Sequence, residues 1–320
     1  MARNLFFALH ALALLGLYAA GLDRLFTWLL FLALLGTFAL GLADMAQTGH
    51  SLRRNFPLFA RARWVAEHLR PFVRQYLLES DTDGAPINRM FRSIVYQRAK
   101  GDLDSVPFGT RVDTYREGYE WIGHSIAALN LSDLDRNPRV RIGGPDCARP
   151  YDASVLNVSA MSFGALSANA VRALNKGASI GGFYQNTGEG GLSEFHRAYG
   201  GDLTWQIGTG YFGCRNPDGS FSPERFADTA ALDAVRMIEV KLSQGAKPGH
   251  GGILPASKND EVIALIRGVE PYTEVVSPSA HTAFDSPRGL LEFIARLRTL
   301  AGGKPVGFKL CVGRQSEFIA

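Results

Sequence analysis

The first 44 residues form two nearly uncharged apolar runs. These runs cover residues 5–22 and 25–43, and only Asp23 and Arg24 separate them. At about 1.5 Å per residue, each run is about as long as a helix needs to cross the hydrocarbon core of a bilayer. We therefore expect an N-terminal transmembrane helical hairpin. The alternatives are one span preceded by a packed or re-entrant segment, and a cleaved signal peptide.

A cluster of arginines follows the second apolar run. Residues 45–100 carry ten Lys or Arg and four acidic residues, whereas residues 1–44 are neutral and residues 101–320 carry 22 basic and 24 acidic residues. Short basic segments beside a span stay in the cytoplasm. We expect an inner, cytoplasmic membrane protein whose catalytic part, from His50 onward, faces the cytoplasm. The charge is local rather than spread over a folded face, so a nucleic-acid partner is not expected.

The chain between residues 45 and 150 looks helical at first and then irregular. Trp64, Leu69, Phe72 and Tyr76 form an apolar stripe near helical spacing, which either core packing or contact with a membrane surface explains. A short helix resumes at residues 91–96. We divide the chain into transmembrane helices at 1–44, a basic juxtamembrane region at 45–150 and an enzyme-like region at 151–320.

Short apolar segments alternate with helical stretches from residue 154 onward. The expected helices cover residues 168–180, 223–236, 260–266 and 287–300. The expected strands lie in SVLNVSA, GGFYQNTGEGG, LTWQIGTG, MIEVKLSQGAKPG, TEVVSPSAH and VGFKLCVG. Such alternation predicts a parallel α/β fold. Polar and Gly-rich residues follow every strand, which favours a (β/α)8 TIM-type barrel over an open doubly wound sheet.

Several familiar sites are excluded. GTGYFG at residues 208–213 has the GxGxxG spelling, but the turn-forming CRNPDG follows it, whereas a dinucleotide fingerprint must open a helix. Ser162 lies in AMSFG rather than GxSxG, and the chain contains no HExxH, so neither a hydrolase nor a metal site is expected. The three cysteines lie far apart, which leaves no iron–sulfur cluster and no four-cysteine zinc site.

Cationic and small residues at the predicted strand ends suggest an anionic, planar ligand. MSFG at residues 161–164 and NTGEGG at residues 186–191 let the backbone approach a flat ring. Lys241 and Lys247 lie together in KLSQGAKPGHGG, whereas Arg267 and Lys309 come from later units. Positive charges that converge on one cavity are costly unless an anion binds there. A phosphate-bearing cofactor and a dicarboxylate substrate would supply such anions.

The motifs AMSFGALS, NTGEGG, KLSQGAKPGHGG and VGFKL together resemble the flavin-binding domain of glutamate synthase. The similarity runs from about residue 140 to the end and is stronger to the stand-alone, membrane-anchored members of the FMN-binding glutamate synthase family. It implies that FMN lies across the mouth of a (β/α)8 barrel. It also implies that reduced flavin delivers hydride to 2-iminoglutarate, which forms from 2-oxoglutarate and ammonia, to yield glutamate.

The resemblance also assigns roles to individual residues. Glu189 resembles the acid beside the imine and ammonia path, and we expect it to act in catalysis together with Lys247. The flavin contacts implied by the resemblance are Met161, Ser162, Gln206, Lys241 and Lys309. The 2-oxoglutarate contacts that it implies are Gln244, Lys247, Arg267 and Ser286.

Two features depart from the family. The apolar runs occupy the place of the glutaminase domain, so no glutaminase is expected and the source of ammonia, free or derived from glutamine, is open. The chain also ends after the sixth predicted strand, whereas a full barrel needs about 250 residues. We expect a truncated chain whose family activity belongs to the intact protein. The alternatives are a membrane-anchored flavin or metabolite-binding protein and an inactive fragment. The electron donor is not assigned.

Overall fold

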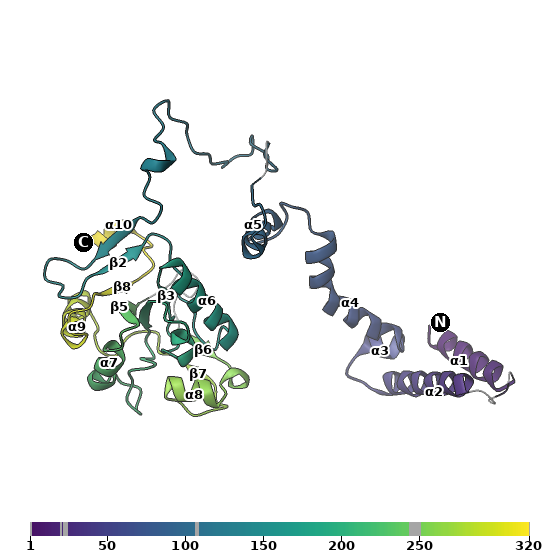
Figure 1. Ribbon diagram of the computed structural model, residues 1–320. Coiled ribbons are helices and arrows are strands. Elements are labelled where there is room, and N and C mark those ends of the chain that lie inside the picture. The colour runs from purple at the N-terminus through teal and green to yellow at the C-terminus, as the bar shows by residue number, and fades with distance from the viewer. Residues whose placement is uncertain (1, 20, 22–24, 106–108, 243–250, 320) are drawn as a thin grey trace. The chain divides into compact units, whose positions relative to one another are not determined.

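The computed structural model describes residues 2–19, 21, 25–105, 109–242 and 251–319 (Figure 1). The chain forms two compact units, Met1–Ile126 and Ala127–Ala320. The second unit begins earlier than the boundary at residue 150 that we expected. The reason is that β1 (Arg139–Ile142) pairs antiparallel with β2 (Tyr151–Ser154), which ties the residues before 150 to the second unit.

The first unit begins with two apolar helices in contact, α1 (Ala2–Ala19) and α2 (Leu25–Ala46). The ring of Phe6 stacks on that of Phe38 at 6.0 Å, and His10 Nε2 lies 3.2 Å from Thr37 Oγ1. Within the described residues, α2 is the one helix long and apolar enough to cross a membrane, because the apolar part of α1, Asn4–Ala19, is shorter. The expected pair of spans is therefore not confirmed.

Three further helices follow in the first unit: α3 (Ser51–Asn55), α4 (Phe59–Val73), which continues into a π-helical turn at Arg74–Leu78, and α5 (Arg89–Lys100). The buried carboxylate of Asp44, near the end of α2, fixes the start of α4. It accepts hydrogen bonds from Arg61 Nη2 at 2.7 Å and Nε at 2.9 Å, and from Leu58 N at 3.2 Å. This contact joins the end of α2 to α4.

The second unit contains a parallel sheet of four strands in the order β3-β4-β5-β8. Its strands are β3 (Gln185–Asn186), β4 (Leu203–Ile207), β5 (Val235–Lys241) and β8 (Val306–Lys309). Val158 adds an isolated parallel bridge to Gln185 beyond β3. The register places Gln206 beside Glu239, and Lys241 beside Lys309, so one face of the sheet carries polar side chains.

The prediction that the segment TEVVSPSAH forms a strand of the parallel sheet is wrong. Val275–Val276 (β7) pairs antiparallel with Ile253–Leu254 (β6), and β5 pairs directly with β8. The segment after β7 is tied to the β4 end instead, because Thr209 Oγ1 donates to Pro278 O at 2.6 Å. The second unit is therefore a mixed α/β structure with a parallel sheet of four strands.

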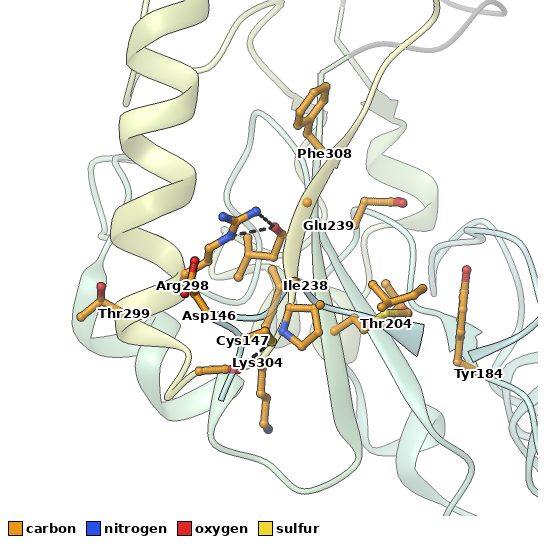
Figure 2. A pocket seen from close by; sticks show the side chains of 18 residues that line it. Asp146, Cys147, Tyr184, Thr204, Ile238, Glu239, Arg298, Thr299, Lys304 and Phe308 are labelled. Carbon is orange, nitrogen blue, oxygen red and sulfur yellow. Dashed lines mark hydrogen bonds between the residues drawn. The ribbon is translucent and has the colours of Figure 1, made fainter. Parts of the chain in front are cut away.

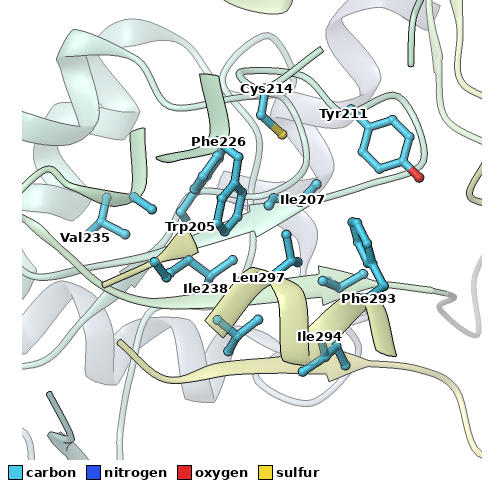
Figure 3. Close-up of a cluster of buried hydrophobic side chains, with 14 of the residues drawn as sticks. Trp205, Ile207, Tyr211, Cys214, Phe226, Val235, Ile238, Phe293, Ile294 and Leu297 are labelled. Atoms are coloured by element: carbon cyan, nitrogen blue, oxygen red, sulfur yellow. The ribbon is translucent and has the colours of Figure 1, made fainter. Parts of the chain in front are cut away.

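Among the residues that the structure describes, three helices pack against strands of the parallel sheet: α6 (Ala168–Gly181), α7 (Pro223–Ala230) and α9 (Pro287–Leu300). The unit also contains α8 (Glu261–Arg267), which packs near β6 and β7, the short exposed α10 (Gln315–Ile319), and 3₁₀ turns at Leu131–Asp133, Glu194–Arg197 and Ala256–Lys258. Figure 3 shows the main core, in which Trp205 and Ile238 of the strands pack against Phe226 of α7 and Leu297 of α9. The helix expected at 223–236 is too long, because Val235 already begins β5.

Candidate active site

The carboxyl ends of the parallel strands enclose a cavity of about 240 Å³. Residues from five segments that are separate in the sequence meet there: the loop after Val158, the loop after β3, strand β4, and the last residues of β5 and of β8. All five residues to which the sequence assigned flavin contacts line this cavity together with Glu189; these are Met161, Ser162, Gln206, Lys241 and Lys309.

Glycines let two backbone segments approach each other at the wall of this cavity. Gly188 has φ +67°, and a Cβ there would lie 2.5 Å from the backbone nitrogen of Ser162. A Cβ on Gly190 would lie 3.0 Å from Ser162 Cβ. The conformation and the space both require glycine at residue 188, since other residues disfavour positive φ. NTGEGG thus positions its backbone directly against MSFG.

Glu189 and Lys241 form an ion pair inside the cavity. Lys241 Nζ lies 2.7 Å from Glu189 Oε1, and their side chains are 11% and 22% exposed, respectively. Gly208 leaves room for the pair, because a Cβ at that position would collide with the carboxylate of Glu189. Among the described residues, Lys309 forms no ion pair, so its charge is available to an anion.

A cluster of two buried amides and a half-buried carboxylate holds Gln206 in place at the cavity. Glu239 Oε1 accepts hydrogen bonds from Gln206 Nε2 at 2.6 Å and from Asn186 Nδ2 at 3.1 Å. Because the amide nitrogen of Gln206 is engaged in this way, its side-chain position is fixed. Sequence reasoning missed Glu239 and Asn186. The signal for Glu239 is its spacing of two residues from Lys241 within an otherwise apolar strand, which places both on the same face.

A smaller cavity of about 170 Å³ adjoins the first and shares Ser162, Ala165 and Glu189 with it. Arg267, which is 9% exposed, contributes its positive charge. Its Nη2 donates to Phe163 O at 3.2 Å, and its guanidinium carbon lies 5.0 Å from the centroid of the Phe212 ring. Burial lowers the pKa of Arg267, and the nearby carboxylate of Glu189 opposes that shift. The site therefore holds an oriented, partly desolvated cation.

A histidine and a tyrosine hold the loop after β7 against the end of β5. His281 Nε2 lies 2.9 Å from Lys241 O, and its Nδ1 lies 3.1 Å from the hydroxyl of Tyr211. A carbonyl can only accept, so Nε2 carries the proton and Nδ1 accepts from Tyr211. Burial lowers the pKa of His281, consistent with a neutral ring. Neither residue was singled out from the sequence, where each looks like an ordinary core residue.

The other residues that the resemblance assigns to 2-oxoglutarate binding are Gln244, Lys247 and Ser286. Gln244 and Lys247 lie outside the described residues. Ser286 is exposed and serves as the N-cap of α9, where its Oγ accepts from Gly289 N at 3.2 Å. The structure therefore brings together Glu189, Arg267 and the five flavin-assigned residues, but it does not bring Ser286 to either cavity.

A larger cavity lies at the opposite, amino ends of the strands (Figure 2). It measures about 710 Å³ and is lined by Thr204, Ile238, Lys304 and the loop around Cys147. Lys304 Nζ donates there to the carbonyls of Ala230 and Leu232, at 2.5 and 2.8 Å, which caps the end of α7. Lys304 therefore has a structural role at this cavity. In the described part of the chain, no group of His, Cys, Asp or Glu is arranged to hold a metal ion.

Comparison with known families identifies the second unit together with the last residues of the first. Residues 112–320 match the model for the conserved region in glutamate synthase. The chain belongs to the glutamate synthase family. The glutamate synthase domain is a TIM-barrel family, and in such barrels active sites form at the carboxyl ends of the strands. The cavity that Glu189 and Lys241 line lies at this end.

Individual relatives agree with the family assignment. The chain is 34% identical over 313 residues to the glutamate synthase large subunit-like protein YerD of Bacillus subtilis, an alignment that covers 86% of this chain and 59% of that protein. It is 30% identical over 267 residues to the archaeal-type glutamate synthase [NADPH] of Thermotoga neapolitana, covering 81% of this chain and 49% of the relative. The chain thus spans half to three-fifths of the length of these glutamate synthase relatives.

Proposed function

We propose that the carboxyl-end cavity binds FMN and that the protein catalyses the reductive amination of 2-oxoglutarate to glutamate. The observation that carries this proposal is that Met161, Ser162, Gln206, Lys241 and Lys309 line one cavity together with Glu189. The family assignment supports it, because glutamate synthase family proteins use FMN. As the chain spans only part of its relatives, the proposal concerns the protein of which these residues form the flavin domain.

The cavity has the features that a flavin requires. Gly188 and Gly190 bring the backbone of residues 186–191 within contact distance of Ser162, so no side chain projects from these two positions. Lys309 and Lys241 supply positive charge for an anionic ring or phosphate. FMN, when bound, would supply the hydride. Because Glu239 already binds the amide nitrogen of Gln206, the carbonyl oxygen of that amide is left for a ligand donor.

Arg267 and Glu189 have distinct roles in the proposed reaction. The buried guanidinium of Arg267 would bind a carboxylate of 2-oxoglutarate, as a charge-assisted contact in a low-dielectric cavity is strong. Glu189 borders both cavities, so its carboxylate can hold or accept a proton between the flavin-binding side and the substrate side. Condensation of 2-oxoglutarate with ammonia releases water and gives 2-iminoglutarate, and addition of a hydride and a proton then gives glutamate.

The electron donor is outside this proposal. GTGYFG at residues 208–213 is followed by turns, and the next helix along the chain, α7, begins only at Pro223. A dinucleotide fingerprint opens a helix whose N-terminus meets the pyrophosphate, so these glycines do not form one. Thr209 and Tyr211 instead anchor the loop after β7, through Pro278, His281 and Ala283.

We also propose that α2 anchors the protein in the cytoplasmic membrane with the second unit in the cytoplasm. Two observations support this: α2 is apolar and 22 residues long, and six arginines lie between residues 53 and 74 directly after it. Basic residues beside a span favour the cytoplasmic side.

The proposed reaction is tested on the purified, FMN-loaded protein. After anaerobic reduction of the flavin, addition of 2-oxoglutarate and ammonium should reoxidise the flavin and produce glutamate in equal amount. Omission of ammonium is the control, since it removes the imine. Flavin that stays reduced in the presence of both substrates would overturn the proposal and favour a flavoprotein that acts on a different ligand.

A further inference from the structure

We propose that α4 and the π-helical turn after it lie on the surface of an anionic membrane, with Arg70 and Arg74 binding lipid phosphates. This proposal goes beyond the oxidoreductase function, and it rests on the proposed membrane anchor only for the position of α4. The helix spans Phe59–Val73, and the turn continues it through Arg74–Leu78.

An apolar stripe runs along this segment and is exposed. Val65, Leu69, Phe72, Val73 and Tyr76 follow each other at spacings of four, three, one and three residues, which places them on one helix face. Their exposures are 58%, 48%, 55%, 39% and 65%. An isolated exposed apolar residue needs no explanation, but a continuous exposed stripe indicates a binding surface.

Trp64 departs from the stripe that the sequence predicted. It faces α3, where its ring lies 5.8 Å from the ring of His50 and 5.1 Å from the guanidinium carbon of Arg53. Of the two explanations that the sequence left open, packing inside the first unit thus accounts for Trp64. This packing does not cover the rest of the predicted stripe, because Leu69, Phe72 and Tyr76 are exposed.

A basic row borders the apolar stripe. Arg63, Arg70 and Arg74 lie seven and four residues apart, so they share a second face of the helix. Between residues 45 and 78 the chain carries six arginines and one acidic residue, Glu67, which pairs with Arg63. An apolar face beside a cationic face is the pattern of helices that lie in the headgroup region of anionic membranes.

A groove marks the line where the two faces meet. It measures about 680 Å³, and its walls include Leu69 and Val73 on the apolar side and Arg70 and Arg74 on the basic side. Two acidic residues, Glu79 and Asp83, also line it. Glu79 is paired with Arg92, and Asp83 forms no ion pair within the part of the chain that the structure describes, so two arginines and the Asp83 carboxylate determine the charge of the groove. This combination suits a lipid phosphate with its acyl chain beside it.

The contact between Asp44 and Arg61 positions α4 for this role. Asp44 lies two residues before the end of α2, and both oxygens of its buried carboxylate accept hydrogen bonds from Arg61. If α2 spans the bilayer, α4 starts where α2 leaves it, at the level of the headgroups. Anionic lipid therefore matches both the location and the charge of the surface.

The test measures amide hydrogen exchange of residues 62–78 in the full protein. The protein is reconstituted in nanodiscs of phosphatidylcholine alone or mixed with phosphatidylglycerol. We expect slower exchange in the anionic discs, and the double variant Arg70→Gln/Arg74→Gln should lose about an order of magnitude of that protection. The matched control, Arg116→Gln/Arg136→Gln, removes the same charge from two exposed arginines outside the helix and should keep the protection.

Three results would overturn the proposal. One is equal exchange in neutral and anionic discs, and a second is an equal loss in the control variant, which would mean that total charge alone matters. The third is protection in an uncharged detergent equal to that in the anionic discs, which would mean that anionic lipid adds nothing. The proposed α2 span is tested separately. If the parent protein leaves neutral discs on alkaline washing, α2 does not span the bilayer. Protection of residues 62–78 that occurs only in anionic discs would still support the proposed binding of α4 to anionic lipid.

Discussion

Lys241 Nζ and Glu189 Oε1 lie 2.7 Å apart, at the carboxyl end of β5 and in the loop after β3. The pair joins two strand ends that are separated by β4 in the sheet. Because the two charges compensate each other, a further anion in the cavity would be attracted mainly by Lys309. Lys309 is therefore the most informative residue for testing cofactor binding.

Gly188→Ala should disrupt the wall of the cavity. The new methyl group would lie 2.5 Å from Ser162 N, and φ is +67°, so both contact and backbone conformation are unfavourable. We expect a lower melting temperature and FMN binding weakened at least tenfold. Gly177→Ala is the control, because its Cβ meets nothing within 4 Å and it lies inside α6. That change should leave stability equal or raise it by about 0.5–1 kcal/mol. Equal effects of the two substitutions would argue against the close approach.

The protein should lose stability as the pH falls from neutral toward the lowered pKa of the buried His196. Burial lowers the pKa of His196 to about 4, and its Nδ1 lies 2.8 Å from Ser193 Oγ. The unfolded histidine titrates near 6.5, so between these values the unfolded state binds more protons, and stability falls with falling pH. The loss from pH 7.5 to pH 5 amounts to about 2 kcal/mol from this residue.

His196→Gln isolates that contribution. The variant should be less stable at neutral pH but should show a flatter dependence of the unfolding free energy on pH, measured by denaturant titration at the two pH values. Part of the slope should remain, since burial also lowers the pKa of His281. A variant with the full slope of the parent would show that His196 is protonated in the folded protein.

Lys247→Ala tests the substrate assignment, which rests on the similarity of KLSQGAKPGHGG to the family. Loss of a charge-assisted contact costs about 1.5–3 kcal/mol, or roughly a 10- to 100-fold weaker affinity for 2-oxoglutarate. FMN should stay bound. The measurement is the change in the flavin spectrum on titration with 2-oxoglutarate, and Arg116→Ala serves as a control for loss of charge. An unchanged affinity in Lys247→Ala would remove this residue from the substrate site.

Removal of residues 1–44 should release the protein into the soluble fraction, because it removes most of α2. The flavin content of the remaining protein should not change. In right-side-out vesicles the intact protein should resist added protease after His50, and permeabilised vesicles provide the positive control. Cleavage of the protein after His50 in intact vesicles would contradict the cytoplasmic orientation.

Local sequence signals predicted the helices of the second unit where caps are clear. Ser286 followed by Pro287 begins α9 at the expected residue, and Ser167 caps α6. The helix that starts at Pro223 was predicted too long, because a turn at Leu232 and the alternating residues of β5 look helical when read without their partners. Periodicity does not encode which strand is the neighbour, so the sequence could not show that β7 pairs with β6.

The candidate site could be predicted as far as its motifs extend. Residues within AMSFGALS, NTGEGG and VGFKL meet in one cavity, as strand ends in a parallel sheet do. The supporting contacts could not be read in this way: Glu239 to Gln206, and His281 to Lys241, join residues 33 and 40 positions apart. Ser286 was assigned to the substrate by resemblance, but its role as the N-cap of α9 explains this serine without any ligand.

The most direct test of the central claim is an FMN titration, followed by flavin fluorescence, of the parent, Lys309→Ala and Thr204→Val. Lys309 lines the carboxyl-end cavity, whereas Thr204 lines the larger cavity at the amino ends and its buried Oγ1 has no hydrogen-bond partner among the described residues. We predict stoichiometric binding by the parent, about 10- to 100-fold weaker binding by Lys309→Ala, and unchanged binding by Thr204→Val. Undiminished binding by Lys309→Ala, or weakening only in Thr204→Val, would contradict the placement of FMN at the carboxyl ends of the strands.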